Sequence, residues 1–512
     1  MLVGQGIDLV ELTTEEIQEA YAAGEYTSVD LTKAFLERID RYEDYYNAFI
    51  SMNPEALDIA ARLDEEYRSS GPRGPLHGVP VVIKDNMDYS GLVTTAGFWG
   101  FSTAMGGIDM IPSDDAAAVE RLRDAGAIIL GKTNLPDFAG HGTRTNSSVA
   151  GVTLNPYNVT KAPGGSSGGT ATAVNASFAV LGLGTETGGS IQNPSSAQAL
   201  VGVKPTYGLV PLEGVYPING SYVDVVGPMA KNVYDAAVTL DIIAGPTTDD
   251  FATFAAVDHI PENGYASALA EAVIEGKRFG LVGSGWRERW LPLDPKTETV
   301  YREAISTLTD LGAVVIEDPF AGSAFIELYG ERPGVPSQGA YDRQIYLQGL
   351  GSDAAFHSIE EWEELSGELF GRGGQGERRR VPPARPGATE EGDAFQSWRM
   401  EIRELFRSIM AEHELDALFF PQAGAPNRDL IEDPERPDYN PNNWPELPSN
   451  IINDFGVPAV TVPYAYYEDS TPFVLVFIGD MWTEADLLGY AYIFEQAVMS
   501  RRAPELIDKG SN

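Results

Sequence analysis

Two serines in glycine-rich segments are the residues best suited to chemistry in this chain. Ser166 lies in Pro-Gly-Gly-Ser-Ser-Gly-Gly (163–169), and Ser190 follows Thr187-Gly188-Gly189, 24 residues later. Glycine has no Cβ, so backbone N–H groups can approach a bound oxyanion and a serine hydroxyl can project into a cleft. This pattern is typical of a hydrolase with a serine nucleophile and a backbone oxyanion hole.

A lysine at the end of a hydrophobic segment could serve as the base. Lys84 ends the segment Gly-Val-Pro-Val-Val-Ile-Lys (78–84). To accept a proton from a serine it must be neutral, so burial has to lower its pKa from about 10.4 by several units. Lys132 and Lys204 also follow apolar residues, and we assign both of them supporting roles in the fold.

Together, the segments 78–86 and 163–206 resemble the amidase signature family of serine hydrolases. Further family-like segments are 94–97, 131–135, 155–157 and 224–229. The resemblance covers most of the chain, is densest from about 76 to 246, and recurs weakly from about 455 to 503.

The resemblance implies a Ser–cisSer–Lys triad. Ser190 would be the nucleophile, Ser166 the bridging serine after a cis peptide bond, and Lys84 the base. Backbone N–H groups of Thr187, Gly188 and Gly189 would form the oxyanion hole. Ser167 is expected to support the site through hydrogen bonds rather than to catalyse.

The implied reaction is cleavage of a carboxamide bond through an acyl-enzyme, with no cofactor and no metal. By analogy with the family, residues 137–145 border the acyl pocket, including Phe138, Gly140 and His141. The implied fold is α/β: a large mixed β-sheet covered by helices on both faces. The substrate would be a small-molecule amide, a carbamate or a peptide amide.

Several positions depart from the family pattern. Glu186 stands where Asp is common, Gln192 where Arg is common, and Asn-Pro-Ser-Ser (193–196) is atypical. Val474 and Val476 replace a usual glycine and glutamine. Losing the arginine removes a cation beside the site, so these changes bear on substrate preference more than on the type of reaction.

Other functional classes have weaker support. Residues 164–168 also fit the Gly-x-Ser-x-Gly elbow of α/β-hydrolases, but that motif needs a strand directly before it, and 155–163 is polar and turn-rich. No His-x-x-x-His spacing and no Walker A motif occurs. Three alternatives stay open: a carbamate- or ester-cleaving member of the family, the amidase subunit of a tRNA-dependent amidotransferase, and a binding protein on an inactive amidase scaffold.

Hydrophobic periodicity predicts helices and buried strands in alternation. Helices are expected from Thr13 to Gly24, with Thr13 and Glu16 as a capping box, and then from Ser28 and over about 54–69. Short apolar runs bounded by turn residues predict strands at 79–83, 127–130, 178–183, 279–282, 313–316, 417–420, 459–462 and 473–478. This alternation is typical of a sheet covered on both faces.

We expect one amidase domain over 1–512. It comprises a helical N-terminal segment (about 8–70), the signature core (about 76–246) and a variable, substrate-covering region (about 320–450). Within that region, 371–387 and 433–448 are predicted to be surface loops or lids. A closing helix is expected over 483–501, with Thr483 and Asp486 forming its cap.

The composition is strongly acidic. Seventy-five Asp and Glu against 35 Lys and Arg give a net charge of −40, which repels nucleic acid and anionic membrane surfaces. An acidic solvated surface or adaptation to high salt would each explain this charge. There is no cysteine, no long uninterrupted apolar run and no basic N-terminal leader. We therefore expect a cytoplasmic monomer or homodimer.

Overall fold

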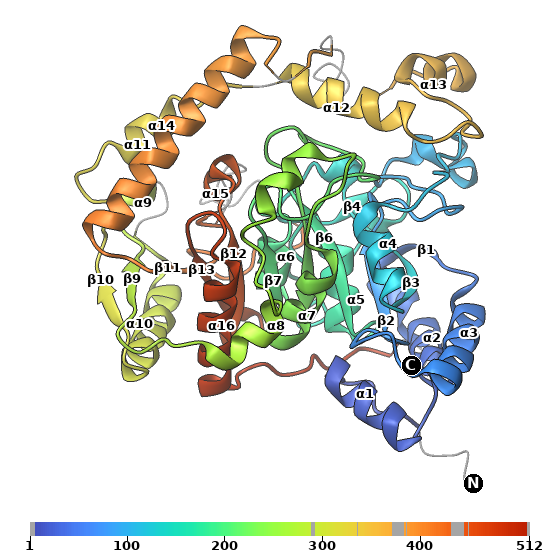
Figure 1. Cartoon of the computed structure of the whole chain (residues 1–512), viewed down its shortest axis with the longest axis horizontal. Coiled ribbons are helices and arrows are strands. Elements are labelled where there is room, and N and C mark those ends of the chain that lie inside the picture. The colour runs from blue at the N-terminus through green and yellow to red at the C-terminus, as the bar shows by residue number, and fades with distance from the viewer. Residues whose placement is uncertain are drawn as a thin grey trace.

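A large mixed β-sheet runs through the molecule (Figure 1). The computed structural model describes residues 6–287, 292–334, 336–370, 383–385, 387–431, 445–448 and 450–508. Within these ranges, eleven strands form one sheet in the order β1-β3-β2-β6-β8-β7-β12-β13-β11-β9-β10. The strands are β1 (Phe49–Met52), β2 (Pro80–Lys84), β3 (Ile128–Thr133), β6 (Leu181–Glu186), β7 (Val201–Lys204), β8 (Val225–Ala230), β9 (Arg278–Leu281), β10 (Val314–Ile316), β11 (Ala417–Pro421), β12 (Ala459–Tyr466) and β13 (Pro472–Ile478), while β4 (Asn146–Ser147) and β5 (Gly151–Val152) form a separate pair.

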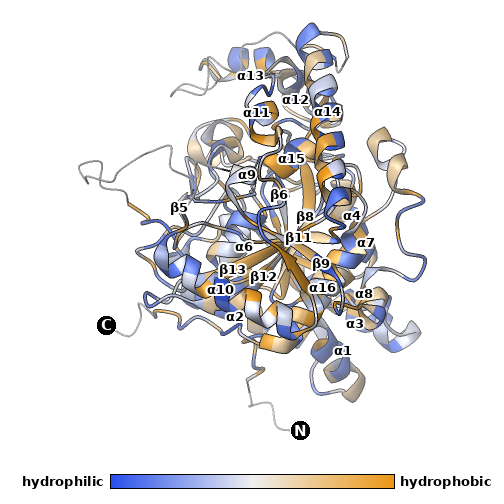
Figure 2. Ribbon diagram, turned by 90° about the vertical axis from the view of Figure 1, so that its left-hand side faces the viewer, coloured by the Kyte–Doolittle hydropathy of each residue, from blue (hydrophilic) through white to orange (hydrophobic). Residues whose placement is uncertain are grey.

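Helices cover both sides of the sheet, with α6 and α10 on one side and α7 and α8 on the other (Figure 2). The α-helices are α1 (Thr14–Ala23), α2 (Ser28–Tyr46), α3 (Ala56–Ser70), α4 (Ala117–Asp124), α5 (Gly168–Asn175), α6 (Gln192–Ala197), α7 (Val233–Ile243), α8 (Tyr265–Ala268), α9 (Ser284–Arg287), α10 (Pro295–Asp310), α11 (Phe325–Gly330), α12 (Pro336–Gln348), α13 (Ile359–Ser366), α14 (Glu390–Glu412), α15 (Ile451–Phe455) and α16 (Glu484–Val498). Short 3₁₀ turns are η1 (Trp99–Phe101), η2 (Thr103–Met105), η3 (Asp137–Ala139), η4 (Phe251–Ala256) and η5 (Leu269–Glu271). The predicted α/β architecture is confirmed.

The central strands place the signature segments side by side. β2 pairs in parallel with β3 and with β6, and β6 pairs antiparallel with β8. All five residues of β2 and all six of β6 are buried, as expected for strands read as continuous apolar runs. Because neighbouring parallel strands end at the same edge, Lys84 at the end of β2 lies beside Thr185 near the end of β6.

Helix signals in the sequence were informative at the N-terminus and misleading at the C-terminus. Thr13 and Glu16 form the predicted capping box of α1, and Gly24 ends that helix in a left-handed conformation. The predicted cap of α16 is wrong. Thr483 precedes the helix, but its Oγ1 donates to the Asp480 carbonyl at 2.8 Å, so it does not accept from the first turn.

The C-terminal tail returns to the first part of the chain. Arg501 is largely buried, and its guanidinium donates to both carboxylate oxygens of Glu11 at 2.7 and 2.9 Å. It also donates to Asn175 Oδ1 at 3.1 Å and to the Ala199 carbonyl. This buried cation thus links the tail, the N-terminal segment and the helices of the signature region.

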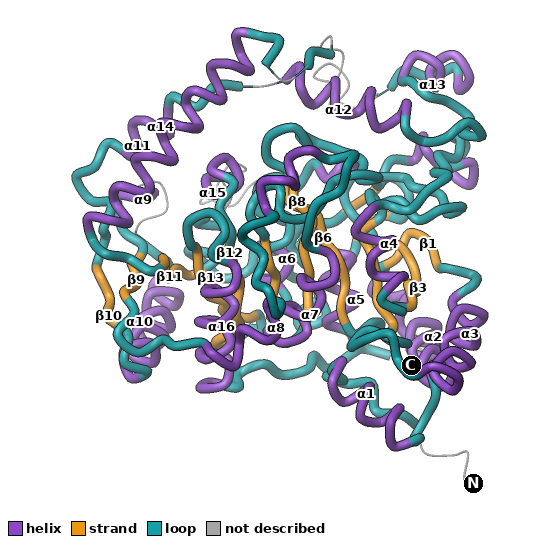
Figure 3. The backbone as a smooth tube through the Cα atoms, in the orientation of Figure 1, coloured by secondary structure: helices purple, strands orange, loops and turns teal. Residues whose placement is uncertain are grey.

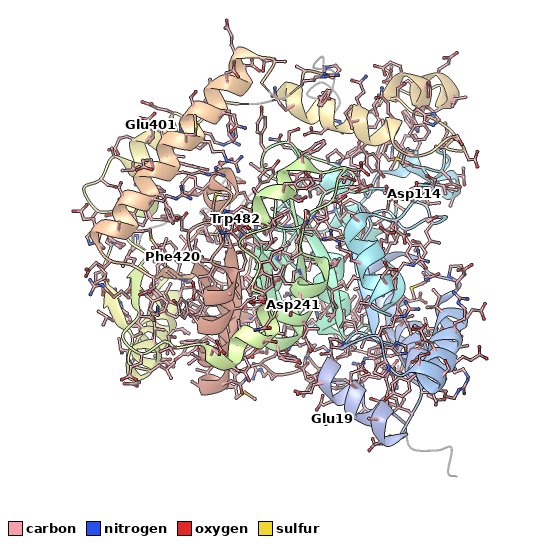
Figure 4. The ribbon with its side chains drawn as sticks, viewed as in Figure 1. Glu19, Asp114, Asp241, Glu401, Phe420 and Trp482 are labelled. Atoms are coloured by element: carbon pink, nitrogen blue, oxygen red, sulfur yellow. The ribbon has the colours of Figure 1, made fainter. Side chains whose placement is uncertain are left out.

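Helices α12, α13 and α14 arch over one edge of the sheet, within the region predicted to be variable (Figure 3). The predicted loops at 371–387 and 433–448 lie largely outside the described residues. Acidic side chains are spread over the outside, as Glu19, Asp114 and Glu401 show, whereas Phe420 on β11 is fully buried (Figure 4). In the described ranges, none of the helices is long and apolar enough to cross a membrane.

Candidate active site

Lys84 and Ser166 meet in the interior of the protein. Lys84 Nζ lies 2.7 Å from Ser166 Oγ, and it donates to Thr185 Oγ1 at 2.9 Å and to the Thr185 carbonyl at 3.1 Å. Both side chains are fully buried. The peptide bond between Gly165 and Ser166 is cis, as the resemblance implied. The lysine amine therefore contacts two hydroxyl groups, those of Ser166 and Thr185, and the Ser166 hydroxyl is the closer of the two.

The surroundings of Lys84 favour its neutral form. Burial lowers the pKa of Lys84 to about 7, and the nearby carboxylates Glu186 and Asp224 oppose that shift. A neutral amine has a lone pair and can act as a base, whereas an ammonium group cannot. Near pH 7 a substantial share of the molecules therefore carries the basic form.

The pKa shift of Lys84 predicts a stability gain in Lys84→Met. Because the folded pKa lies below the unfolded value of about 10.4, the unfolded chain binds more protons between pH 7 and 10. Wild-type stability should therefore rise with pH across that window. The variant should be more stable by about 4 kcal/mol at pH 6, with the gap closing towards pH 10. Denaturant unfolding at four pH values checks this, and a gap independent of pH would contradict it.

Ser190 lies in a tight loop directly after β6. Its side chain is 7% exposed, and its carbonyl accepts a hydrogen bond from the Ser167 N–H at 3.2 Å. This bond brings the two serine segments together, and it gives Ser167 the supporting role that we expected. Gly189 has φ of +104°, which only glycine adopts without strain.

The loop is held from both ends. Glu186 accepts from the backbone N–H groups of Ile191 at 2.8 Å and Gln192 at 3.0 Å, and from Gln192 Nε2 at 2.5 Å. Thr187 Oγ1 donates to Asp224 Oδ1 at 2.6 Å, and burial raises the pKa of Asp224 to about 6. Gln192, at the position where arginine is common, thus donates to Glu186 from both its backbone and its side-chain amide.

Backbone N–H groups of this loop are available for a ligand. Within the part of the chain that the structure describes, the N–H groups of Thr187, Gly188, Gly189 and Ser190 donate to no protein acceptor. Backbone donors without internal partners are a requirement for stabilising a developing oxyanion. The oxyanion-hole role of these residues stays a prediction.

Glycines around Ser166 allow the close approach of neighbouring backbone. Gly164 has φ of +78°, and a Cβ there would overlap the backbone of Pro194. A Cβ on Gly165 would lie 2.5 Å from the His141 carbonyl and 2.8 Å from that of Arg144. The serine segment is thus wedged between α6 and the loop that contains His141.

The three predicted acyl-pocket residues lie in different surroundings. Phe138 packs in an aromatic cluster, with ring centroids 4.9 Å from Phe98 and 5.3 Å from Phe370. His141 Nδ1 accepts from the N–H groups of Thr143 at 3.2 Å and Arg144 at 3.0 Å, while the Gly140 N–H donates to the Asp137 carbonyl at 3.1 Å. Of the three, His141 comes near the triad, through its backbone. Their roles toward a substrate stay predictions.

Two further buried lysines, Lys132 and Lys204, have hydrogen-bond partners elsewhere. Lys132 lies in β3, where it donates to Thr94 Oγ1 at 2.6 Å and pairs with Asp85 at 3.4 Å. Lys204 donates to the carbonyls of Pro205 and Val457, both at 2.8 Å. Neither has a serine partner in the described ranges, which agrees with the supporting roles expected for both.

Two cavities reach residues near the loop, although residues 187–190 line neither of them. One of about 490 Å³ reaches Asp224 and is lined also by Asp88, Asp342 and Tyr346. A smaller one of about 20 Å³ lies between Gly164, Asn193 and Glu446. The larger has the volume of a small-molecule site.

Sequence reasoning missed several residues of this site. Thr185 binds the lysine amine, and Asn86 Nδ2 donates to Thr185 Oγ1 at 3.1 Å. Both lie inside segments that carried the resemblance, and their polar side chains at strand ends were the available signal. Asn450, before α15, lies against Gly188 from 262 residues away, and nothing local in the sequence indicates that contact.

The contact between Gly188 and Asn450 predicts a paired effect. A Cβ on Gly188 would overlap Asn450 Oδ1, the end of an exposed side chain that can move aside, so Gly188→Ala should displace that side chain and lower kcat/KM by no more than about 10-fold. Asn450→Ala in the same chain removes the obstacle and should restore most of the loss. Equal activity of the single and double variants would show that the clash is not the cause.

No cluster of metal-ligating side chains occurs in the described residues. The lysine, the two serines and the loop of free N–H groups are the parts that hydrolysis through a serine ester requires. A family model named Amidase matches residues 30–488, and the chain therefore belongs to the amidase family.

Curated relatives agree with that assignment. The chain is 33% identical over 500 residues to a glutamyl-tRNA(Gln) amidotransferase subunit of Alkaliphilus metalliredigens, covering 95% of this chain and 96% of the relative. It is 35% identical over 497 residues to the protein of the same name from Chloroflexus aurantiacus, with the same coverage.

Solved structures of amidases share the fold. The peptide amidase PAM bound to the competitive inhibitor chymostatin superposes with a TM-score of 0.82 at 33% identity, covering 98% of this chain and all of that one. Native peptide amidase from Stenotrophomonas maltophilia gives 0.81 at 32% identity over 98% and 99%. The chain is thus an amidohydrolase that cleaves C–N amide bonds.

Proposed function

We propose that the chain hydrolyses amides through an acyl-enzyme on Ser190. The observation that carries this proposal is the 2.7 Å contact between a fully buried Lys84 amine and Ser166 Oγ, beside the Ser190 loop. Ser166 accepts the proton of the Ser190 hydroxyl while its own proton passes to neutral Lys84. The Ser190 oxygen then forms a bond to the substrate carbonyl carbon, and N–H groups of residues 187–190 stabilise the oxyanion.

The same groups complete the cycle. As the C–N bond breaks, the proton on Lys84 returns through Ser166 to the departing nitrogen, which leaves as amine or ammonia. Water then attacks the Ser190 ester, giving its proton to the relay, and the carboxylic acid leaves as Ser190 regains its hydrogen. Every proton taken up is returned, so the cycle needs no cofactor.

The substrate class is inferred from neighbours and charge. Similarity to proteins named peptide amidase supports a peptide amide or a small-molecule amide as substrate. Similarity to amidotransferase subunits supports the alternative of an ammonia donor within a complex. The net charge of −40 weighs against close association with RNA.

Purified chain alone, assayed on a matched panel of amide, ester and carbamate substrates, tests the proposal. We expect ammonia or amine release from simple amides without any partner. A chain that releases ammonia only with added partner subunits would favour the amidotransferase alternative. Faster cleavage of the matched carbamate or ester would assign the chain to that branch of the family.

We extend the proposal to localisation, oligomeric state and domain organisation. We propose a cytoplasmic monomer or homodimer, with one domain over 1–512 whose region from about 320 to 450 covers the substrate.

The acidity would suit high salt, where repulsion among carboxylates is screened. Running the same panel from 0.1 to 3 M salt tests that part, and a maximum at low salt would argue against it.

A further inference from the structure

The cavity of about 490 Å³ lies between the candidate active site and α12. One of its walls contains Asp88, four residues after Lys84, and Asp224, whose Oδ1 accepts from Thr187 Oγ1 at 2.6 Å. Another wall belongs to α12, which arches over this edge of the sheet (Figure 1). A ligand in this cavity would therefore lie next to the loop that leads to Ser190.

Carboxyl groups dominate the charge of this cavity. Its described lining residues include no lysine, arginine or histidine but six acids, which are Asp88, Glu213, Asp224, Asp249, Asp250 and Asp342. Asp88 and Asp224 are buried, whereas Glu213 and Asp249 are exposed. None of the six forms an ion pair within the part of the chain that the structure describes. Their negative charge is therefore not matched by a bound cationic side chain.

Neutral donors hold two of these carboxylates in place. Asp224 Oδ2 accepts from the N–H groups of Ile218 at 2.9 Å and Asn219 at 2.8 Å. Asp342 Oδ2 accepts from the Ser221 N–H at 3.0 Å, and its Oδ1 accepts from Ser221 Oγ. Such donors orient a carboxylate but leave its charge in place. The walls are therefore preorganised for a cation.

The carboxyl groups show the effect of this missing counter-charge. Burial raises the pKa of Asp88 and that of Asp224 to about 6 each, and it also raises the pKa of Asp342. The nearby cation Lys132 opposes the shift of Asp88, and Arg343 opposes that of Asp342, but neither cancels it. A cation bound in the cavity would favour the charged carboxylates.

The general acidity of the chain does not by itself explain this imbalance. A second cavity, of about 440 Å³ beside α3 and α4, is also lined by acids, but arginines accompany them there. Arg73 donates to both carboxylate oxygens of Glu66, each at 2.6 Å, and Arg123 pairs with Asp115. The lack of such partners is thus a property of the cavity beside the candidate active site.

Aromatic and aliphatic side chains complete the walls. They include Tyr207, Leu212, Val215, Tyr341, Ile345 and Tyr346. Aromatic faces attract organic cations. In the described residues, no three acids come together in an arrangement that could hold a metal ion. The walls therefore fit an organic ammonium group with an apolar stem better than a metal ion or an anion.

We propose that this cavity binds an alkylammonium group of the substrate, so that the chain prefers amides that carry a positive charge. This preference rests on the hydrolysis proposed at Ser190 and defines its substrate class. The ammonium group would donate to the carboxylates of the cavity while the scissile amide lies at Ser190, on the other side of Thr187. Because the attraction is electrostatic, the preference should weaken as salt rises.

Pairs of amides that differ in charge and are closely matched in shape test this preference. N-acetyl-lysine amide and N-acetyl-norleucine amide differ in the acyl part, whereas N-(4-aminobutyl)acetamide and N-pentylacetamide differ in the leaving amine. We expect kcat/KM to be about 10-fold or more higher for the cation in at least one pair. This ratio should fall towards one as sodium chloride rises from about 0.05 to 1 M.

Variants locate the origin of the preference. Asp342→Asn and Glu213→Gln each remove one negative charge from the cavity, and each should lower the ratio by about 3-fold or more. Glu66→Gln makes the same change in net charge in the second cavity and should keep the ratio. Each ratio is taken within one variant, so a general loss of activity or stability does not affect it.

The outcomes separate the cation site from the hydrolysis itself. Ratios at or below one in both pairs, a preference that survives in both Asp342→Asn and Glu213→Gln, or one lost equally in Glu66→Gln would overturn the proposal. Release of neither ammonia nor amine from any of the four amides would instead count against hydrolysis at Ser190. Calorimetric titration with pentylammonium chloride then decides on the cavity: saturable binding that Asp342→Asn weakens supports the cation site, and no binding overturns it.

Discussion

Replacing Ser190 by alanine should reduce kcat for amide hydrolysis by roughly 10⁴- to 10⁶-fold and abolish labelling by a fluorophosphonate probe. The variant keeps the backbone N–H groups of residues 187–190, so substrate should still bind. Mass spectrometry of the intact protein after exposure to the probe measures the loss directly. The wild type should gain the mass of one probe on the peptide that contains Ser190.

Ser195 provides a matched control for that experiment. It lies five residues later, is fully buried, and its hydroxyl has no hydrogen-bond partner in the described ranges. Ser195→Ala should therefore keep both labelling and turnover. Probe mass retained in Ser190→Ala would assign the nucleophile to another residue and remove the basis of the acyl-enzyme. Absence of labelling in the wild type would instead favour a binding protein on an inactive scaffold.

Replacing Lys84 by alanine should lower kcat/KM by about 10²- to 10⁴-fold, most severely near neutral pH. In the wild type, kcat/KM should rise as pH increases through about 7, because only the neutral amine accepts a proton. In the variant, this rising limb of the pH profile of kcat/KM should be absent. At high pH the loss should shrink, because hydroxide can partly replace the base.

The pH profile separates a base from a merely structural lysine. Lys204 is also fully buried, and its pKa is lowered to about 8 by burial, but its amine binds two carbonyls. Lys204→Met should therefore leave the rise of kcat/KM near pH 7 in place. A rise near pH 6 that persists in Lys84→Ala would point to a carboxyl group such as Asp224, which accepts from Thr187, or Asp88, because burial raises the pKa of each to about 6. A wild-type profile flat from pH 5 to 9 would refute the role of Lys84.

Local patterns in the sequence predicted the parts of the fold that depend on local physics. Apolar runs located eight of the eleven strands described in the sheet within a few residues, whereas β1, β7 and β8 were not predicted. Thr13 with Glu16 located the first helix. The cap assigned to Thr483 failed because its backbone is not extended, so the hydroxyl turns back to Asp480. A capping pattern in the sequence does not fix the backbone angles that the cap requires.

The candidate site was predictable in its residue types and less so in its contacts. Lys84 is hydrogen-bonded to Ser166, and the Ser190 loop is joined to the same segment by the Ser167 N–H, while the catalytic roles of the three side chains stay predictions. The contact of Asn450 with Gly188 and that of Arg399 with Gly456 join segments distant in the chain. Such pairings follow from packing across the sheet, and neither spacing nor composition encodes them.

Arg501 connects the C-terminal tail to the N-terminal segment and to the signature region. Its side chain holds Glu11 near the start and the Ala199 carbonyl just before β7, within the stretch that carries the catalytic candidates. Proteolytic clipping of the last dozen residues would thus leave an uncompensated acid at one end and an unsatisfied carbonyl at the other. The activity of a shortened chain would therefore reflect this loss of structural contacts as well as the catalytic step.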